Sequence, residues 1–143
     1  MGDISKNFSL SEFVHSEKAL ENGINNVIPS ADIKLAIRKL VDNILQPLRD
    51  SLGASVVINS GYRSELLNFM LGGAKTSQHR KGEASDIRSP FYQPIEIARR
   101  IVELKLPFDQ LIVYPGFVHV SHKAKGKQRG QILYNDAYKG DKI

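Results

Sequence analysis

The stretch that decides the fold reads Ser77-Gln78-His79-Arg80-Lys81-Gly82-Glu83-Ala84-Ser85-Asp86. It places an imidazole and a carboxylate seven residues apart, with small residues between them. A second histidine, His119, follows about thirty residues later. Two histidines and one carboxylate form the ligand set of an open zinc site, in which a fourth position stays free. The residue types also fit a simpler interpretation, in which His79 is a surface-loop histidine and Asp86 caps a strand end.

Alternation along two expected strands bears on this choice. Residues 83–88 favour a strand in which Ala84 and Asp86 share one face, because successive strand side chains point to opposite sides. Residues 117–121 favour another strand, with His119 on the face opposite the two valines beside it. A lone strand histidine is more often a hydrogen-bonded core residue than a ligand, so this pattern alone leaves both interpretations open.

Helical spacing and β-branched runs alternate irregularly along the rest of the chain. Helices are expected after the N-cap candidates Ser9 and Ser30, over 65–71 and from Pro94, and further strands over 55–59, 109–114 and 131–134. Pro47 is expected to kink the helix that follows Ser30. These patterns predict an α+β fold in a single domain over residues 1–143, with a small antiparallel sheet carrying the zinc site and helices packed on one side. The polar residues 135–143 are expected to form a flexible tail.

Composition excludes some classes of site. The 143 residues contain no cysteine, so disulfides and thiolate metal sites are excluded. The net charge of +5 suits an anionic partner such as a cell-wall polymer, nucleic acid or membrane surface, or simply a solvated basic surface. Residues 1–6 lack the cationic start and apolar core of a signal peptide, and no apolar run is long enough to insert into a membrane.

Several segments carry a resemblance to a known family. The opening stretch matches S-x-H-x-x-G-x-A-x-D, and it resembles the zinc D-alanyl-D-alanine carboxypeptidase and L-alanyl-D-glutamate endopeptidase family, whose fold hedgehog signalling domains share. The segments 60–64 (S-G-Y-R-S), 108–112 (F-D-Q-L-I) and 117–121 (F-V-H-V-S) are similar to further family motifs. Residues 13–48 are similar to the leading helical part of small phage-type and bacterial members. The similarity extends over roughly residues 5–134.

This resemblance implies a set of site residues. It implies Zn²⁺ held by His79, Asp86 and His119. It implies that Arg63 binds a substrate carbonyl or carboxylate, for which a guanidinium fork is suited. Ser77 would hydrogen-bond substrate near the metal, and Gln78 would assist or simply fill the loop.

The general base is where this chain departs from the family. Members commonly place a glutamate shortly before the last histidine ligand, but residues 112–116 contain no carboxylate. Asp109 is the nearest acid, and its candidate roles are general base, orientation of a ligand histidine, or strand cap. Tyr114 is the candidate oxyanion stabiliser or proton donor.

The function implied is that of a zinc metallopeptidase that hydrolyses peptide bonds in peptidoglycan stem peptides, as a D,D-carboxypeptidase or endopeptidase. We expect a monomer made in the cytoplasm that acts at the cell wall after release, as a phage-type lysin, or as a virion component. One alternative is a non-catalytic zinc-containing module that binds the wall or builds the virion. The other is a basic nucleic-acid-binding protein, based on the run Lys123, Lys125, Lys127 and Arg129, but without a nucleic-acid motif no nucleic-acid partner is expected.

Overall fold

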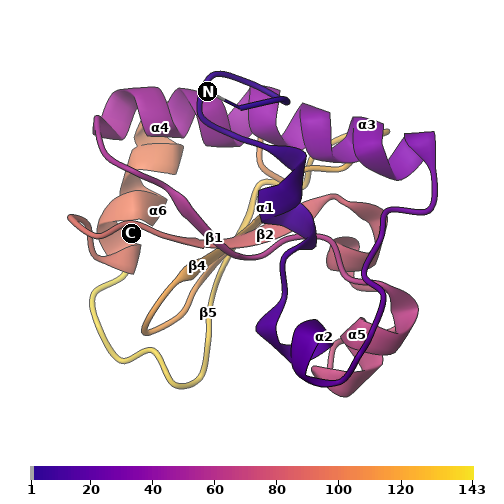
Figure 1. Ribbon diagram of the computed structural model, residues 1–143. Coiled ribbons are helices and arrows are strands. Elements are labelled where there is room, and N and C mark those ends of the chain that lie inside the picture. The colour runs from indigo at the N-terminus through magenta and orange to yellow at the C-terminus, as the bar shows by residue number, and fades with distance from the viewer. Residues whose placement is uncertain (1) are drawn as a thin grey trace.

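A long helical segment lies across the top of the molecule, with the sheet beneath it (Figure 1). In this computed structural model, which describes residues 2–143, the segment comprises α3 (Ala31–Leu40), a π-helical turn (Val41–Leu45) and α4 (Gln46–Leu52). Ser30 caps its start by accepting a hydrogen bond from the Ile33 N–H. Gly53 ends it in the left-handed conformation at φ 62°.

Pro47 changes the winding of this helix. It has no N–H to donate to the carbonyl four residues earlier, so a regular α-turn loses one bond at this point. The preceding turn is instead π-helical, and the Gln46 N–H donates to the carbonyl of Val41, five residues back. The expected local disturbance therefore lies in the turn before the proline.

The sheet has five strands in the order β1-β2-β4-β3-β5. They are β1 (Val57–Ser60), β2 (Ala84–Arg88), β3 (Gln110–Val113), β4 (Val118–Ser121) and β5 (Gln131–Tyr134). The α+β class is confirmed, but the sheet is mixed, because β5 pairs with β3 in parallel while the other pairs are antiparallel. β4 ends beside the start of β3, where the Asp109 N–H donates to the Ser121 carbonyl, so the chain enters β5 from the same end as β3.

Helices cover one face of this sheet. α6 (Pro94–Glu103) contacts β3, β4 and α4, and the π-turn lies over the same core. Fully buried side chains join these layers, among them Ile44, Leu48, Ile101, Ile87 and Val120. Burial of each such side chain is worth roughly 1.5–3 kcal/mol, so this face is firmly closed. The opposite face is left for polar side chains.

Short helical segments complete the fold. They are α1 (Leu10–Val14), α2 (Glu17–Glu21), α5 (Glu65–Met70) and a 3₁₀ turn (Gln78–Lys81). Ser9 and Glu12 form the expected capping box of α1. The 3₁₀ turn lies inside the stretch that leads into β2, and it positions the first half of the sequence motif.

The last residues contact the sheet. The Asn135 N–H donates to the Val113 carbonyl, and the ring of Tyr138 stacks on Tyr134 at 6.0 Å. The flexibility of residues 135–143 stays a prediction. From Gly2 to Ile143, none of the helices has the length and apolar character needed to cross a bilayer.

Candidate metal centre

Asp86 and His119 stand opposite each other on neighbouring strands. Asp86 on β2 pairs with His119 on β4, which in turn pairs with Ile112 on β3. Side chains directly across an antiparallel pair share a face and lie close together. Their neighbours along the strands, Ile87 and Val118, are fully buried on the helix side. The two polar side chains therefore project from the open face, and His119 Nδ1 lies 2.9 Å from Asp86 Oδ1.

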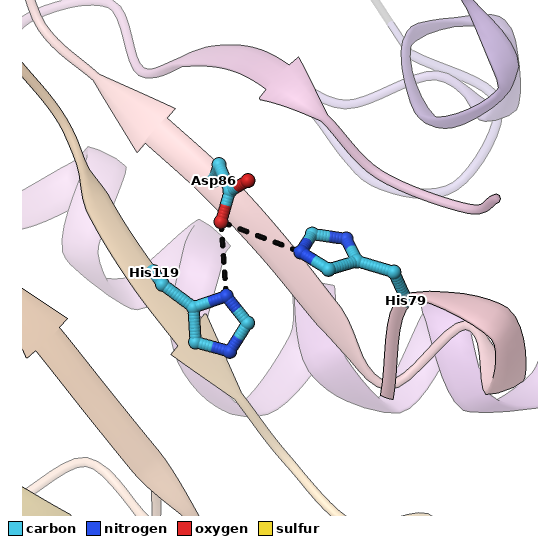
Figure 2. A group of neighbouring side chains, drawn as sticks. All are labelled: His79, Asp86 and His119. Carbon is cyan, nitrogen blue, oxygen red and sulfur yellow. Dashed lines mark hydrogen bonds and ion pairs between the residues drawn. The ribbon is translucent and has the colours of Figure 1, made fainter. Parts of the chain in front are cut away.

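His79 reaches the same point from the 3₁₀ turn. Ser77 caps this turn by accepting a hydrogen bond from the His79 N–H at 3.2 Å, and Gly82 ends it at φ 72°. His79 Nδ1 donates to the Gly61 carbonyl at 2.8 Å, which leaves Nε2 as the unprotonated nitrogen. Nε2 lies 3.4 Å from Asp86 Oδ1. Figure 2 shows both rings directed at the same carboxylate oxygen, with the other oxygen turned away.

This arrangement fits zinc. One ligand atom from each of the three residues lies within 4.8 Å of the other two. A tetrahedral zinc with nitrogen and oxygen ligands at about 2.0–2.1 Å separates its ligand atoms by about 3.3 Å. The contacts to the Asp86 oxygen, 2.9 and 3.4 Å, bracket that separation. Two imidazoles and one carboxylate are also the donors of open, catalytic zinc sites.

The protonation states favour a metal ligand set. Burial lowers the pKa of His79, against the opposing pull of Asp86, so the imidazole is neutral near pH 7. Burial on its own would raise the pKa of Asp86, but its close contacts with His119 and His79 outweigh burial and hold the pKa well below the usual range. Metal binding requires a neutral imidazole and an ionised carboxylate, and these are the forms that result.

Arg63 braces the second oxygen of the same carboxylate. Its Nη2 lies 3.4 Å from Asp86 Oδ2, and its Nε donates to the Ser60 hydroxyl at 3.0 Å. The Arg63 N–H donates to the His79 carbonyl, so β1, the 3₁₀ turn and β2 are joined at this residue. Burial lowers the pKa of Arg63, opposed by Asp86, but the guanidinium stays charged.

A polar cavity of about 410 Å³ opens over the three metal-binding candidates. Its lining comprises Arg63, Ala74, Thr76, Ser77, Gln78, His79, Asp86, Gln110, Ile112, Tyr114, His119 and Arg129. The candidate substrate residues Arg63, Ser77 and Gln78 are therefore brought to one site. Tyr114 is there as well, stacked on Phe117 at 4.3 Å. Burial, reinforced by Asp86, raises the pKa of Tyr114, so its phenol is protonated near pH 7.

Asp109, the candidate general base, does not reach this cavity. Its carboxylate is fully buried and forms a two-pronged ion pair with Arg129, with Nη2 2.6 Å from Oδ2 and Nε 3.1 Å from both oxygens. Burial would raise the pKa of Asp109, but the bonds from Arg129 outweigh it and lower the pKa. The carboxylate is thus a poor proton acceptor. It contacts neither ligand histidine, and its position is that of an anchor for Arg129.

Five lining residues are not among the site candidates of the sequence: Ala74, Thr76, Gln110, Ile112 and Arg129. Gln110 and Ile112 alternate with the buried Leu111 and Val113, so strand periodicity places them on the face of His119. Arg129, the last residue of the basic run, comes from the loop before β5. The sequence indicates the position of Arg129 only indirectly. An aspartate at the start of a buried strand, Asp109, is expected to pair with a basic side chain, because buried carboxylates are seldom left unpaired.

Comparison with known proteins agrees with the motifs. The family model described as Peptidase M15 matches residues 6–121, which is most of the chain. A search of curated proteins found no match to the chain. The matched range contains all three metal-binding candidates together with Arg63, Ser77 and Tyr114, and it ends before Arg129.

Proposed function

The chain belongs to the peptidase M15 family, whose members are zinc-dependent peptidases, and from this premise we propose that it hydrolyses peptide bonds in peptidoglycan stem peptides. The observation that carries the proposal is the convergence of His79, Asp86 and His119 at the polar cavity. The bond cleaved is that of a D,D-carboxypeptidase or of an endopeptidase of the lysin type.

The residues of the cavity have distinct parts in this reaction. Zinc held by the three ligands would lower the pKa of a bound water and polarise the scissile carbonyl. His79 is fixed by Gly61, and Asp86 by Arg63, so little reorganisation is needed on binding. Tyr114 keeps its proton at neutral pH and donates a hydrogen bond to the oxygen on which charge develops.

Substrate contacts come from the other walls of the cavity. Arg63 keeps two of its five donors for a substrate carbonyl or carboxylate, since its bonds to Ser60, Asn68 and Asp86 use Nε, one Nη1 proton and one Nη2 proton. Ser77 and Gln78 stand beside His79 on the 3₁₀ turn and offer a hydroxyl and an amide. They would fix the peptide backbone on either side of the bond cleaved.

Asp109 does not act as the general base in the proposed reaction, because its carboxylate is buried against Arg129. Among the described residues, Asp86 is the only carboxylate that lines the cavity. This observation favours the alternative function, a zinc-containing module that binds the wall or builds the virion without cleaving it. The enzyme proposal requires the metal ligands, Tyr114 and Arg63 to suffice without a carboxylate base.

Digestion of purified peptidoglycan separates the two functions. The zinc-loaded protein is expected to release new amino termini, and mass spectrometry of the muropeptides identifies the bond. His119→Ala should release none. Zinc bound at one ion per chain with no peptide cleaved would reject the enzyme and leave the binding module.

We also propose that the protein acts at the cell wall as a monomer, after release as a phage-type lysin or from a virion. One chain supplies the complete ligand set, and its net charge of +5 suits an anionic wall. Co-sedimentation with purified sacculi, strong at low salt and weak at high salt, is the expected result. Absence of co-sedimentation at low salt would count against the location.

A further inference from the structure

Arg129 brings a second guanidinium into the cavity. Its side chain is 47% exposed, and it lines the same cavity as Arg63 and the three metal-binding candidates. Asp86 is the only acidic side chain in the lining over residues 2–143. A divalent cation on the ligand set adds further positive charge. The charged side chains of the lining therefore carry an excess of positive charge, which favours an anionic ligand.

Asp109 holds this guanidinium in place. Nε and Nη2 of Arg129 bond to the Asp109 carboxylate, and the Arg129 N–H donates to the same carboxylate at 2.8 Å. Backbone bonds fix the flanking residues, since Gly130 donates to the Phe108 carbonyl and Gln131 to the Asp109 carbonyl. Nη1 takes part in none of the hydrogen bonds found over residues 2–143. Because Nε and Nη2 hold the planar guanidinium in place, Nη1 is free to bind an anion. Binding then costs little side-chain conformational entropy.

The two arginines stand on opposite sides of the metal ligands. Arg63 is tied to Asp86 on β2, and Arg129 is tied to Asp109 at the start of β3. β4, which carries His119, lies between β2 and β3. Two strand spacings correspond to roughly 10 Å across the sheet, and Asp109 lies three residues along the chain from Ile112, the partner of His119, which adds roughly 10 Å along the strand. The diagonal of roughly 14 Å is covered by about four residues of an extended peptide. A peptide lying across the sheet would thus pass the metal between the two guanidinium groups.

We propose that Arg129 is a substrate-specificity residue that binds a peptide carboxylate on the side of the metal away from Arg63, positioned there by Asp109. The inference rests on the proposed function, because it assumes a peptide in the cavity. Stem peptides offer this chemistry twice, at the α-carboxylate of their γ-linked D-glutamate and at the C-terminal carboxylate. Arg129 lies beyond the residues that the family model matches, so this preference belongs to this chain's own final segment.

Three synthetic peptides test the proposal on the zinc-loaded full chain. They are L-Ala-γ-D-Glu-L-Lys-D-Ala-D-Ala, the same peptide with the D-glutamate α-carboxylate amidated, and the same peptide amidated at its C-terminus. Dissociation constants are measured for each, with kcat/KM in their place where a peptide is cleaved. Amidation of the carboxylate that Arg129 binds should weaken binding by about 10-fold or more, as expected for a lost charge-assisted hydrogen bond. The amidated peptide whose sensitivity disappears in Arg129→Gln identifies the carboxylate that Arg129 binds.

Arg129→Gln should weaken binding of the unmodified peptide by the same factor and remove the difference between it and the sensitive amide. Lys127→Gln is the matched control, because it removes one charge from the same loop outside the cavity lining, and it should preserve the difference. Arg129→Lys and the double variant Asp109→Asn/Arg129→Gln separate loss of the binding group from loss of folding. The lysine variant should keep part of the discrimination and the double variant none. Unchanged zinc content and melting temperature show that the chain is intact.

The outcomes separate this inference from the proposed function. Peptide discrimination that depends on Arg129, without cleavage, supports the inference and rejects the peptidase. Cleavage with equal kcat/KM for all three peptides, or discrimination that is the same in Arg129→Gln as in the wild type for both amidated peptides, overturns the inference and leaves the peptidase. Binding of none of the peptides also overturns it.

Discussion

His79 Nδ1 lies 2.8 Å from the backbone carbonyl oxygen of Gly61. This bond joins the 3₁₀ turn of the motif to the end of β1, and it decides which ring nitrogen of His79 is free for a metal. Gly61 itself is pressed against α1, since a Cβ at this position would lie 2.7 Å from Phe13 Cα and 2.8 Å from the Phe13 carbonyl oxygen. The orientation of the His79 ring thus depends on Gly61, which packs against a helix that is far away in the sequence.

Gly61→Ala is expected to disturb both stability and metal affinity. The added methyl group must displace the Phe13 backbone or the Gly61 carbonyl, at a cost of roughly 1–3 kcal/mol in the free energy of unfolding. Loss of a bond that orients a ligand histidine weakens metal binding by about 10–100-fold. Urea denaturation and zinc competition with a chelator measure the two effects. Gly116→Ala is the matched control, because its Cβ would meet no atom within 4 Å; an equal loss in both variants would contradict the argument.

His119→Ala is expected to weaken zinc binding by about 100-fold or more, since it removes a ligand rather than a residue that orients one. Metal analysis after dialysis against a chelator of known affinity gives the dissociation constant. His15→Ala serves as the comparison, because the His15 side chain is exposed and its ring nitrogen lies 3.2 Å from a Glu17 carboxylate oxygen. A zinc stoichiometry that survives in His119→Ala would remove His119 from the ligand set.

Strand periodicity is the part of the site that the sequence could predict. Alternation alone puts Asp86 on the face opposite Ile87, and His119 on the face opposite the two valines beside it. The pairing that brings those two side chains to 2.9 Å depends on which strands are neighbours and in what register, and local pattern does not determine that. The spacing of the motif does not predict the orientation of the His79 ring either, because that orientation depends on the hydrogen bond to the Gly61 carbonyl.

The same periodicity explains why the Asp109 carboxylate lies away from the cavity. Asp109 precedes Leu111 and Val113 by steps of two, and both of these side chains are fully buried on the helix side. A short separation from His119 in the sequence does not determine on which face of the sheet the Asp109 side chain lies. Local sequence pattern does not predict that β5 pairs with β3 in parallel either, because this pairing depends on the path of residues 122–130 past the start of β3. That path is also what delivers Arg129 to the cavity.

Asp109→Asn is expected to lower stability at neutral pH and to matter little in acid. The folded state lowers the pKa of Asp109, so its ion pair with Arg129 stabilises the protein above the unfolded pKa of about 3.9 and is lost as the pH falls through the folded value. The difference in unfolding free energy between wild type and variant should be about 1–3 kcal/mol at pH 7. Urea denaturation of the zinc-free protein at pH 7 and at pH 2–3 measures it. A difference that stays constant with pH would contradict the ion pair as its source.

Tyr114→Phe is expected to reduce turnover without changing the metal site. The phenol lies in the cavity, its pKa is raised by burial and by Asp86, and its proton is therefore available for a hydrogen bond throughout the neutral range. Removal of one donor to a developing oxyanion lowers kcat by about 100-fold, whereas KM and zinc content should change little. The phenyl ring retains the stacking on Phe117, so folding is preserved. Tyr138→Phe removes a hydroxyl from a tyrosine outside the cavity lining and should leave kcat unchanged. If Tyr114→Phe turned over stem peptides at the wild-type rate, the oxyanion would have to be stabilised by the metal and Arg63 alone.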